Sequence, residues 1–340
     1  MRTLVLLLTW IALWPLAFVS AGCATNERVV MVKDGSGEQE QHGGAGLFHL
    51  GHRKPWPQVK LNNVKYRLIK YCYSGPEARN ALHCSHVMPA LTVWGNKLGT
   101  PASAKTGHSL AWHETHDDNP DPKKRVLQYC HTPDGNWNPK VPGDALMISI
   151  YFQDPGLALS SIGYSDSSES TTPGRNFVKI GLETNLSDAV HEFGHVLGLV
   201  HEVHRSDRDD YVLYQCKHVI GYQDCLDKAM AAEKMSQQDA SAKLCEDFDF
   251  ATKYNFFGTQ FLKSPGGENV DQGNFDLDSI MLYHSLVMSN SICVIDMHQC
   301  PLLQYKKEGG KTAGLERIPP RDMPSAGDIA LVKKWYPWED

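Results

Sequence analysis

The sequence predicts a mixed α+β protein, and three observations predict it. Segments rich in β-forming residues, such as VKYRLIKYCY (64–73) and ALMISIYF (145–152), alternate with segments of helical pattern. The composition is that of an ordinary globular protein, with 41% hydrophobic and 21% charged residues. The chain has 340 residues, enough to bury one large core or two moderate ones. A formal net charge of -6 offers no basic surface, so we expect no nucleic-acid partner.

The first 21 residues predict export. They are apolar after a single arginine and end in small residues, which is typical of a secretory signal peptide. A membrane anchor would need about 20 apolar residues without a break, and Pro15 interrupts the run. We therefore expect residues 1–21 to be removed and the protein to be secreted and extracellular, with no stable membrane span. The SAGC at 20–23 also resembles a lipoprotein signal, so lipid anchoring through Cys23 is a minor alternative.

The cysteine content agrees with an oxidising compartment. The sequence has nine cysteines, and one of them, Cys23, lies just past the expected cleavage point. The even number that is left suits four disulfides, although eight cysteines allow 105 different pairings. Those cysteines lie at positions 72, 84, 130, 216, 225, 245, 293 and 300.

Residues 22–55 are polar and glycine-rich, so we expect a prosegment or flexible leader there. From Trp56 onward the composition becomes that of a folded domain, expected over 56–340. The segment 77–98 has a helical pattern in its first half and contains Pro89, where we expect a kink. After it we expect a loop at 113–125 that exposes His113 and His116, followed by strands at 125–130, 145–152 and 176–183. A helix capped by Asn185 or Ser187 comes next. The remaining elements expected are a disulfide-tied helical insert at about 213–270 and an amphipathic helix in the last 20 residues.

The stretch VHEFGHVLGLVHEVHRSDRDDYV (190–212) carries the candidate chemistry. His191 and His195 lie four residues apart, so on a helix both rings lie on one face, a single turn apart. That spacing lets two imidazoles reach the same zinc ion at about 2.0–2.1 Å. Glu192 follows the first histidine and can take a proton from a zinc-bound water.

A third ligand requires the helix to end. His201 is ten residues past His191, roughly 15 Å along a continuous helix, and could not reach the same ion. Gly198 tolerates positive φ, so the helix can stop there and the chain can return, which brings His201 to the metal. Three neutral nitrogens then hold one Zn²⁺ per chain and leave one position open for water or substrate.

Two other interpretations of this stretch are weaker. A solvated helix end would account for the residue types, but the pattern H-E-x-x-H-x-x-G-x-x-H arises by chance in roughly one such chain in 10⁴. A purely structural zinc site would want four protein ligands and no adjacent base. The sequence therefore predicts a catalytic zinc site.

The complete motif resembles that of the metzincin clan of zinc endopeptidases. The residue after the third histidine is Glu202, and the continuation HEVHRSDRDDYV (201–212) is similar to the extended signature of the astacin family. Downstream, SIMLY (279–283) resembles the Met-turn, with Met281 beneath the zinc site. The resemblance implies that Tyr283 ligates zinc in the resting enzyme and then moves to stabilise the transition state.

The resemblance also implies the architecture. Two lobes are expected around a cleft: an N-terminal lobe (about 56–198) with a twisted, mostly parallel sheet and helices, and an irregular C-terminal lobe (about 199–340) with the final helix. The strand expected at 176–183 is the candidate edge that pairs with an extended peptide or protein substrate. A monomer suffices for this arrangement.

Processing is expected near HRK (52–54), just before Trp56. In relatives the new amino terminus lies beside the glutamate that follows the third ligand, here Glu202. The carboxylate would otherwise be a partly buried charge without a partner. We therefore expect cleavage to deliver an ammonium group to Glu202.

The function that these features imply is a secreted zinc-dependent endopeptidase. Glu192 activates the zinc-bound water, and Tyr283 stabilises the oxyanion. The competing hypothesis is a non-catalytic secreted binding protein, or toxin-like protein, on a metalloprotease scaffold. That hypothesis predicts a damaged active site, whereas Glu192 and all three histidines are present.

Overall fold

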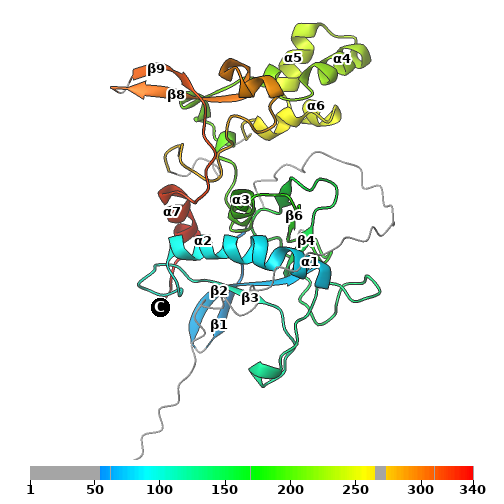
Figure 1. Cartoon of the computed structure of the whole chain (residues 1–340), viewed down its shortest axis with the longest axis vertical. Coiled ribbons are helices and arrows are strands. Elements are labelled where there is room, and N and C mark those ends of the chain that lie inside the picture. Colours follow the sequence, from blue (N-terminus) through cyan, green and yellow to red (C-terminus); the bar gives the residue numbers. More distant parts are fainter. Residues whose placement is uncertain (1–53, 62, 169, 265–272, 310, 340) are drawn as a thin grey trace, which may run out of the picture.

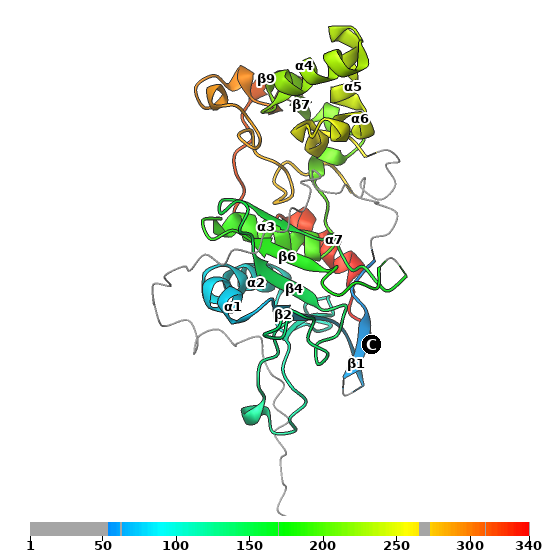
Figure 2. The same ribbon diagram turned by 90° about the vertical axis from the view of Figure 1, so that its right-hand side faces the viewer.

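A computed structural model describes residues 54–61, 63–168, 170–264, 273–309 and 311–339. The expected signal peptide (1–21) and the expected leader (22–55), apart from its last two residues, lie outside the described residues. The chain forms a six-stranded sheet and a three-stranded sheet. Figures 1 and 2 show the larger sheet with α1, α2, α3 and α7 in one lobe, and β7 to β9 with α4, α5 and α6 in the other. The α+β class is confirmed.

The main sheet is mostly parallel, as expected. Its strands run in the order β1-β2-β4-β6-β5, and β3 also pairs with β2. β3, β4 and β6 pair in parallel with their neighbours, whereas β1 and β5 are antiparallel. The strands are β1 (Gln58–Leu61), β2 (Val64–Tyr73), β3 (Leu110–Glu114), β4 (Leu146–Ile150), β5 (Ala158–Ser160) and β6 (Phe177–Ile180).

Two strand predictions are wrong. The segment 125–130 makes single backbone contacts, such as Cys130 N–H to the Tyr73 carbonyl, instead of a ladder. The prediction that 176–183 forms the sheet edge fails because β6 pairs with β4 on one side and β5 on the other. β5 is the outer strand, and with three residues it is too short to give a clear alternating pattern.

The segment 77–98 is helical throughout, beyond the first half that the pattern indicated. α1 (Pro76–Leu82) passes through a π-helical turn (His83–Val87) into α2 (Met88–Leu98). Pro89 falls in the first turn of α2, where its missing N–H is tolerated.

The first core lies between the sheet and α2, α3 (Leu186–Val196) and α7 (Ala326–Trp335). Trp94 of α2 donates its indole N–H to the carbonyl of Val190 in α3 at 2.9 Å, which ties the two helices together. α7 comes last in the chain, yet Val332 and Tyr336 pack into this first core.

The second lobe has its own core and contains the insert. The disulfide Cys216–Cys245 joins the segment before α4 to α5, so the region expected to be a disulfide-tied insert does contain helices and a disulfide. The elements are α4 (Tyr222–Glu233), α5 (Gln237–Glu246), α6 (Phe248–Lys253), and the antiparallel strands β7 (Val212–Tyr214), β8 (Leu302–Glu308) and β9 (Lys311–Glu316). Short 3₁₀ turns lie at Pro122–Lys124, Glu202–His204, Arg208–Asp210, Cys216–His218, Phe257–Phe261, Ser291–Val294 and Met297–Gln299.

The disulfides differ from the expected set. Cys72–Cys130 and Cys293–Cys300 join the pair in the insert, and Cys84 is also disulfide-bonded. Cys225 carries a buried free thiol, so the eight cysteines from 72 to 300 do not form four disulfides among themselves. Within the described ranges, no helix is long and apolar enough to cross a membrane.

Candidate metal centre and active site

α3 is stabilised by a side-chain cap at its start and by an apolar face that packs into the first core. The side chain of Asn185 accepts the backbone N–H of Asp188 at 3.0 Å, so Asn185, of the two candidates, is the cap. Val190, Phe193 and Val196 are fully buried in the first core. Their burial fixes the rotation of the helix and therefore the direction of His191 and His195.

The helix ends where the motif requires it to end. Gly198 has a φ of 95°, a left-handed conformation that suits glycine. A side chain there would also collide with the Trp335 ring, so both the backbone angle and the space demand glycine. The chain turns back directly, since Leu199 donates its backbone N–H to the Gly194 carbonyl at 3.0 Å.

The turn brings the three predicted ligands together. Nε2 of His201 lies 3.1 Å from Nε2 of His191 and 2.9 Å from Nε2 of His195. The candidate ligand atoms all lie within 4.8 Å of one another, close enough to hold one metal ion.

Hydrogen bonds on the far side of the first two rings fix their tautomers. Nδ1 of His191 donates to the carbonyl of Ile280 at 2.8 Å, and Nδ1 of His195 donates to the carbonyl of Leu199 at 2.9 Å. Because a carbonyl only accepts, Nδ1 carries the proton in both rings and Nε2 presents a bare lone pair. Burial lowers the pKa of His191 to about 4, which keeps its ring neutral.

The third ligand is oriented through a histidine that the sequence analysis treated as a satisfied structural or surface residue. His204 is 3% exposed, and its Nδ1 donates to the carbonyl of Leu262 at 2.6 Å. Its Nε2 is therefore an acceptor, and it lies 3.3 Å from Nδ1 of His201. His201 thus has the same tautomer as the other two ligands.

These contacts fit a zinc ion. Three neutral nitrogens converge with their lone pairs facing one another, an arrangement that is repulsive until a cation lies between them. Among the residues that the structure describes, no aspartate, glutamate or cysteine joins the cluster as a fourth ligand. Three imidazoles with one open position are the ligand set of a catalytic zinc site.

Glu192 lies buried beside the cluster, at 7% exposure. Burial raises the pKa of its carboxyl to about 7, while a hydrogen bond from Ser160 opposes that rise. The Ser160 hydroxyl lies 2.5 Å from Oε2 of Glu192. A carboxyl whose pKa lies near neutrality can both accept and return a proton.

Met281 packs against α3 at Gly194. It is 1% exposed in the first core, and its sulfur lies 2.6 Å from the position that a Cβ on Gly194 would take. Its carbonyl accepts the backbone N–H of Glu202 at 3.0 Å. Met281 therefore separates α3 from the segment that carries the third ligand.

The Tyr283 hydroxyl contacts His201 on the side of the ring that faces away from the other two histidines. Its hydroxyl lies 3.0 Å from Nδ1 of His201 and 3.4 Å from Oε1 of Gln260. That ring nitrogen is opposite the Nε2 atom that faces the other histidines. The structure thus brings Tyr283 to the third ligand, with its hydroxyl directed away from the three converging nitrogens.

Glu202 already has partners in this structure. Its Oε1 accepts the backbone N–H of Asp276 at 2.8 Å and lies 3.5 Å from Nε of Arg205. Burial nevertheless raises the pKa of this carboxyl to about 8. Glu202 is therefore not without partners here, and the delivery of an amino terminus to it by cleavage stays a prediction.

Asp328, a residue that the sequence analysis did not single out, supports the Met-turn. Its carboxylate accepts the Ser279 hydroxyl at 2.7 Å and the Ile280 N–H at 2.9 Å. It also completes a capping box with Ser325 at the start of α7. Since the Ile280 carbonyl orients His191, α7 is linked to the metal site. The serine and aspartate three residues apart were the available signal.

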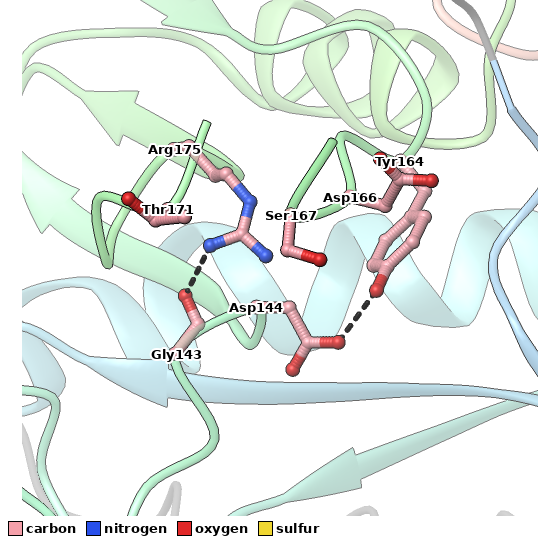
Figure 3. A pocket seen from close by; sticks show the side chains of 7 residues that line it. All are labelled: Gly143, Asp144, Tyr164, Asp166, Ser167, Thr171 and Arg175. Carbon is pink, nitrogen blue, oxygen red and sulfur yellow. Dashed lines mark hydrogen bonds between the residues drawn. The ribbon is translucent and has the colours of Figure 1, made fainter. Parts of the chain in front are cut away.

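A separate open pocket lies at the loop before β6 and holds none of the site residues (Figure 3). It has a volume of about 350 Å³. Its polar groups bond to one another: Tyr164 donates to Asp144 at 2.6 Å, and Arg175 donates to the Gly143 carbonyl at 3.0 Å.

His113 and His116 do not belong to the three-histidine cluster. Both are half-buried, so the prediction that they are exposed is wrong.

Comparison with known proteins agrees with the motif. Residues 143–256, about a third of the chain, match the family model described as Astacin (Peptidase family M12A). No curated protein matches the chain. Among solved structures, the chain is similar to high choriolytic enzyme 1, a hatching enzyme zinc-protease from Oryzias latipes, with 15% identity and a TM-score of 0.41 over 85% of this chain and 96% of that one. It is also similar to myroilysin, with 12% identity and a TM-score of 0.40 over 84% and 97%. The match to the astacin model over residues 143–256 and the converging histidines, rather than these likenesses, support a zinc metalloendopeptidase.

Proposed function

We propose that this protein is a secreted endopeptidase that holds one zinc ion on His191, His195 and His201 and uses Glu192 as its general base. The convergence of three unprotonated Nε2 atoms beside a buried carboxyl carries the proposal. Disulfides in both lobes support an oxidising, extracellular location. Lipid anchoring through Cys23 is the alternative to free secretion.

The chemistry assigns one role to each group. Bound zinc would supply a Lewis acid and an acidified water. Glu192 takes the proton of the attacking water and passes it to the leaving nitrogen of the peptide. Tyr283 donates a hydrogen bond to the developing oxyanion, and for this its hydroxyl must leave Nδ1 of His201.

The substrate is an extended segment of a protein or peptide, paired with the outer strand β5 in the cleft between the lobes. β5 pairs only with β6 among the described strands, so its other edge is open for β-augmentation. Since one chain supplies both the strand and the metal ligands, a monomer is the working unit.

We propose that residues 1–21 are a signal peptide, 22–55 a leader, and 56–340 the catalytic domain, with lobes that divide near residue 198 and with α7 returning to the first lobe. The packing of the first described residues supports the start at Trp56. Trp56 is 2% exposed and donates its indole N–H to the Val196 carbonyl at the end of α3. Cleavage just before Trp56 would leave this anchor in place.

The decisive test is Glu192→Ala in the purified full chain. We expect hydrolysis of a peptide library to be abolished while metal analysis still finds about one zinc per chain, because Glu192 is a base and not a ligand. The exposed Glu183→Ala is the matched control and should keep full activity. Activity in Glu192→Ala, or loss of its zinc, would contradict the general-base role. A wild-type chain that binds zinc and cleaves no peptide would favour the binding-protein alternative.

A further inference from the structure

We propose that Ser160 is a positioning residue for the reaction: it fixes the carboxylate of Glu192 and links it to the strand that holds the substrate. The proposal rests on the proposed function, because it assigns Ser160 a task in the proton transfer by Glu192. Ser160 is the last residue of β5, and its side chain is directed at α3.

The geometry of the contact is that of a strong hydrogen bond. The Ser160 hydroxyl lies 2.5 Å from Oε2 of Glu192 and 3.0 Å from the carbonyl oxygen of the same residue. Distances of 2.5–2.7 Å are typical of a hydroxyl that donates to a carboxylate. Across the part of the chain that is described, Ser160 is the one hydrogen-bond partner of this carboxylate, which makes the contact decisive for its orientation.

The hydrogen bond from Ser160 occupies one oxygen of the Glu192 carboxylate and leaves the other free to accept a proton. With Oε2 held by Ser160, the side chain of Glu192 is restricted in rotation, and Oε1 stays available for the proton of the attacking water. A hydroxyl can donate to a carboxylate and accept from a carboxylic acid, so Ser160 can remain a partner throughout the proton transfer. Glu192 without this partner would be a buried polar group with nothing to hold it.

The backbone of the same residue faces the substrate side. Ser161 donates its N–H to the Phe177 carbonyl, and the Leu157 carbonyl accepts the N–H of Gly181. Because antiparallel bonds alternate along a strand, the N–H and C=O of Ser160 point away from β6, toward the open edge. One residue thus offers its backbone to the substrate and its hydroxyl to the base, which sets the distance between the scissile bond and Glu192.

A purely structural role makes a different prediction. The bond from Ser160 to the Glu192 carbonyl ties β5 to α3, and its loss would lower the stability of the fold. A positioning role also lowers kcat in the folded protein while KM holds, since a misplacement of about 1 Å near the reacting atoms can cost about 10²-fold in rate.

The test compares three variants: Ser160→Ala, Ser160→Thr and Ser161→Ala. Ser161 is the matched control, because its hydroxyl bonds only to the backbone of Phe177 in β6. We expect kcat of Ser160→Ala to fall about 10- to 100-fold in the folded variant, with KM and zinc content close to wild type and only a modest fall in the urea midpoint from the lost bond to the Glu192 carbonyl. Threonine keeps the hydroxyl and should restore kcat, and Ser161→Ala should have normal kcat.

The proposal is overturned if Ser160→Ala keeps its kcat, if Ser161→Ala loses as much, or if threonine fails to rescue. If Ser160→Ala is normal while Glu192→Ala is inactive, the positioning role fails and the proposed function stands. If Glu192→Ala retains activity, both fail together.

Discussion

The two halves of the metal site are built in different ways. α3, which carries His191 and His195, is a regular helix with a cap and an apolar face buried in the first core. The segment 201–208, which carries the third ligand, has only two short 3₁₀ turns. It is buried nonetheless, and polar side chains hold it: His204, Arg205 and Arg208 are all less than 9% exposed.

The contrast shows where each half is vulnerable. α3 depends on shape, because its contacts with the core are apolar and closely packed. The segment after Gly198 depends on individual hydrogen bonds and charges that reach distant parts of the chain, such as Leu262 and Gly273, which lie 58 and 68 positions from their partners. Loss of one polar partner should therefore matter most after Gly198, and a small change of volume should matter most in α3.

The largest effect is expected at Arg205, which is 2% exposed. Its guanidinium contacts both carboxylate oxygens of Asp207, at 2.9 and 2.8 Å, and the carbonyl of Gly273 at 3.0 Å. Arg205→Ala removes these contacts as well as the one with Glu202, and it takes the cation away from both carboxylates. We expect the free energy of unfolding to fall by about 3 kcal/mol or more, measured by urea denaturation.

The exposed Arg125→Ala is the control for that experiment and should leave the urea midpoint within error of wild type. A loss below about 1 kcal/mol for Arg205→Ala would mean that this segment is held by packing, as α3 is. The contrast between the two halves would then be broken.

The second effect tests shape in α3. A Cβ on Gly194 would lie 2.6 Å from the sulfur of Met281 and 3.2 Å from the Trp94 ring. Gly194→Ala should therefore lower the free energy of unfolding by about 1–2 kcal/mol, even though alanine favours helix formation. Gly95→Ala in α2 is the matched control, because its Cβ would meet only a flexible threonine methyl group at 3.1 Å.

A double-mutant cycle separates crowding from other causes. If Met281 is the obstacle, Met281→Ala combined with Gly194→Ala should cost less than the sum of the two single changes. Additive costs would show that the strain lies elsewhere in the helix.

The same contrast explains what could be predicted from the sequence. His191, Glu192 and His195 follow from helical spacing, and the turn at Gly198 follows from the need for positive φ. These are local properties, and the structure agrees with them. Asn185 was one of two possible caps, and only the fold selects between it and Ser187.

The residues that escaped prediction act over long distances in the chain. Asp328 holds the Met-turn from α7, and Ser160 reaches Glu192 from a strand of three residues. The substrate edge was assigned to 176–183 because that segment has the stronger β pattern, whereas sheet order depends on pairing that no local pattern encodes. His113 and His116 were expected to be exposed in a loop, but β3 extends into that segment.

The smallest effect, a loss of zinc affinity, is expected at His204. It sharpens the comparison because it tests a single hydrogen bond of the segment after Gly198. His204 accepts from Nδ1 of His201 and donates to Leu262, so it fixes the third ring as carbonyls fix the first two. His204→Ala removes that acceptor, and the loss of an outer partner typically costs about 10- to 100-fold in metal affinity. We expect a loss near tenfold, because the Tyr283 hydroxyl, 3.0 Å from the same nitrogen, can replace the acceptor in part.

The measurement is zinc competition against a chromophoric chelator, with the exposed His298→Ala as control. In the background of Tyr283→Phe, which removes that second partner, the loss should grow. Unchanged zinc affinity in the double variant would mean that the third ligand is oriented by the backbone alone, and the two halves of the site would then be built alike.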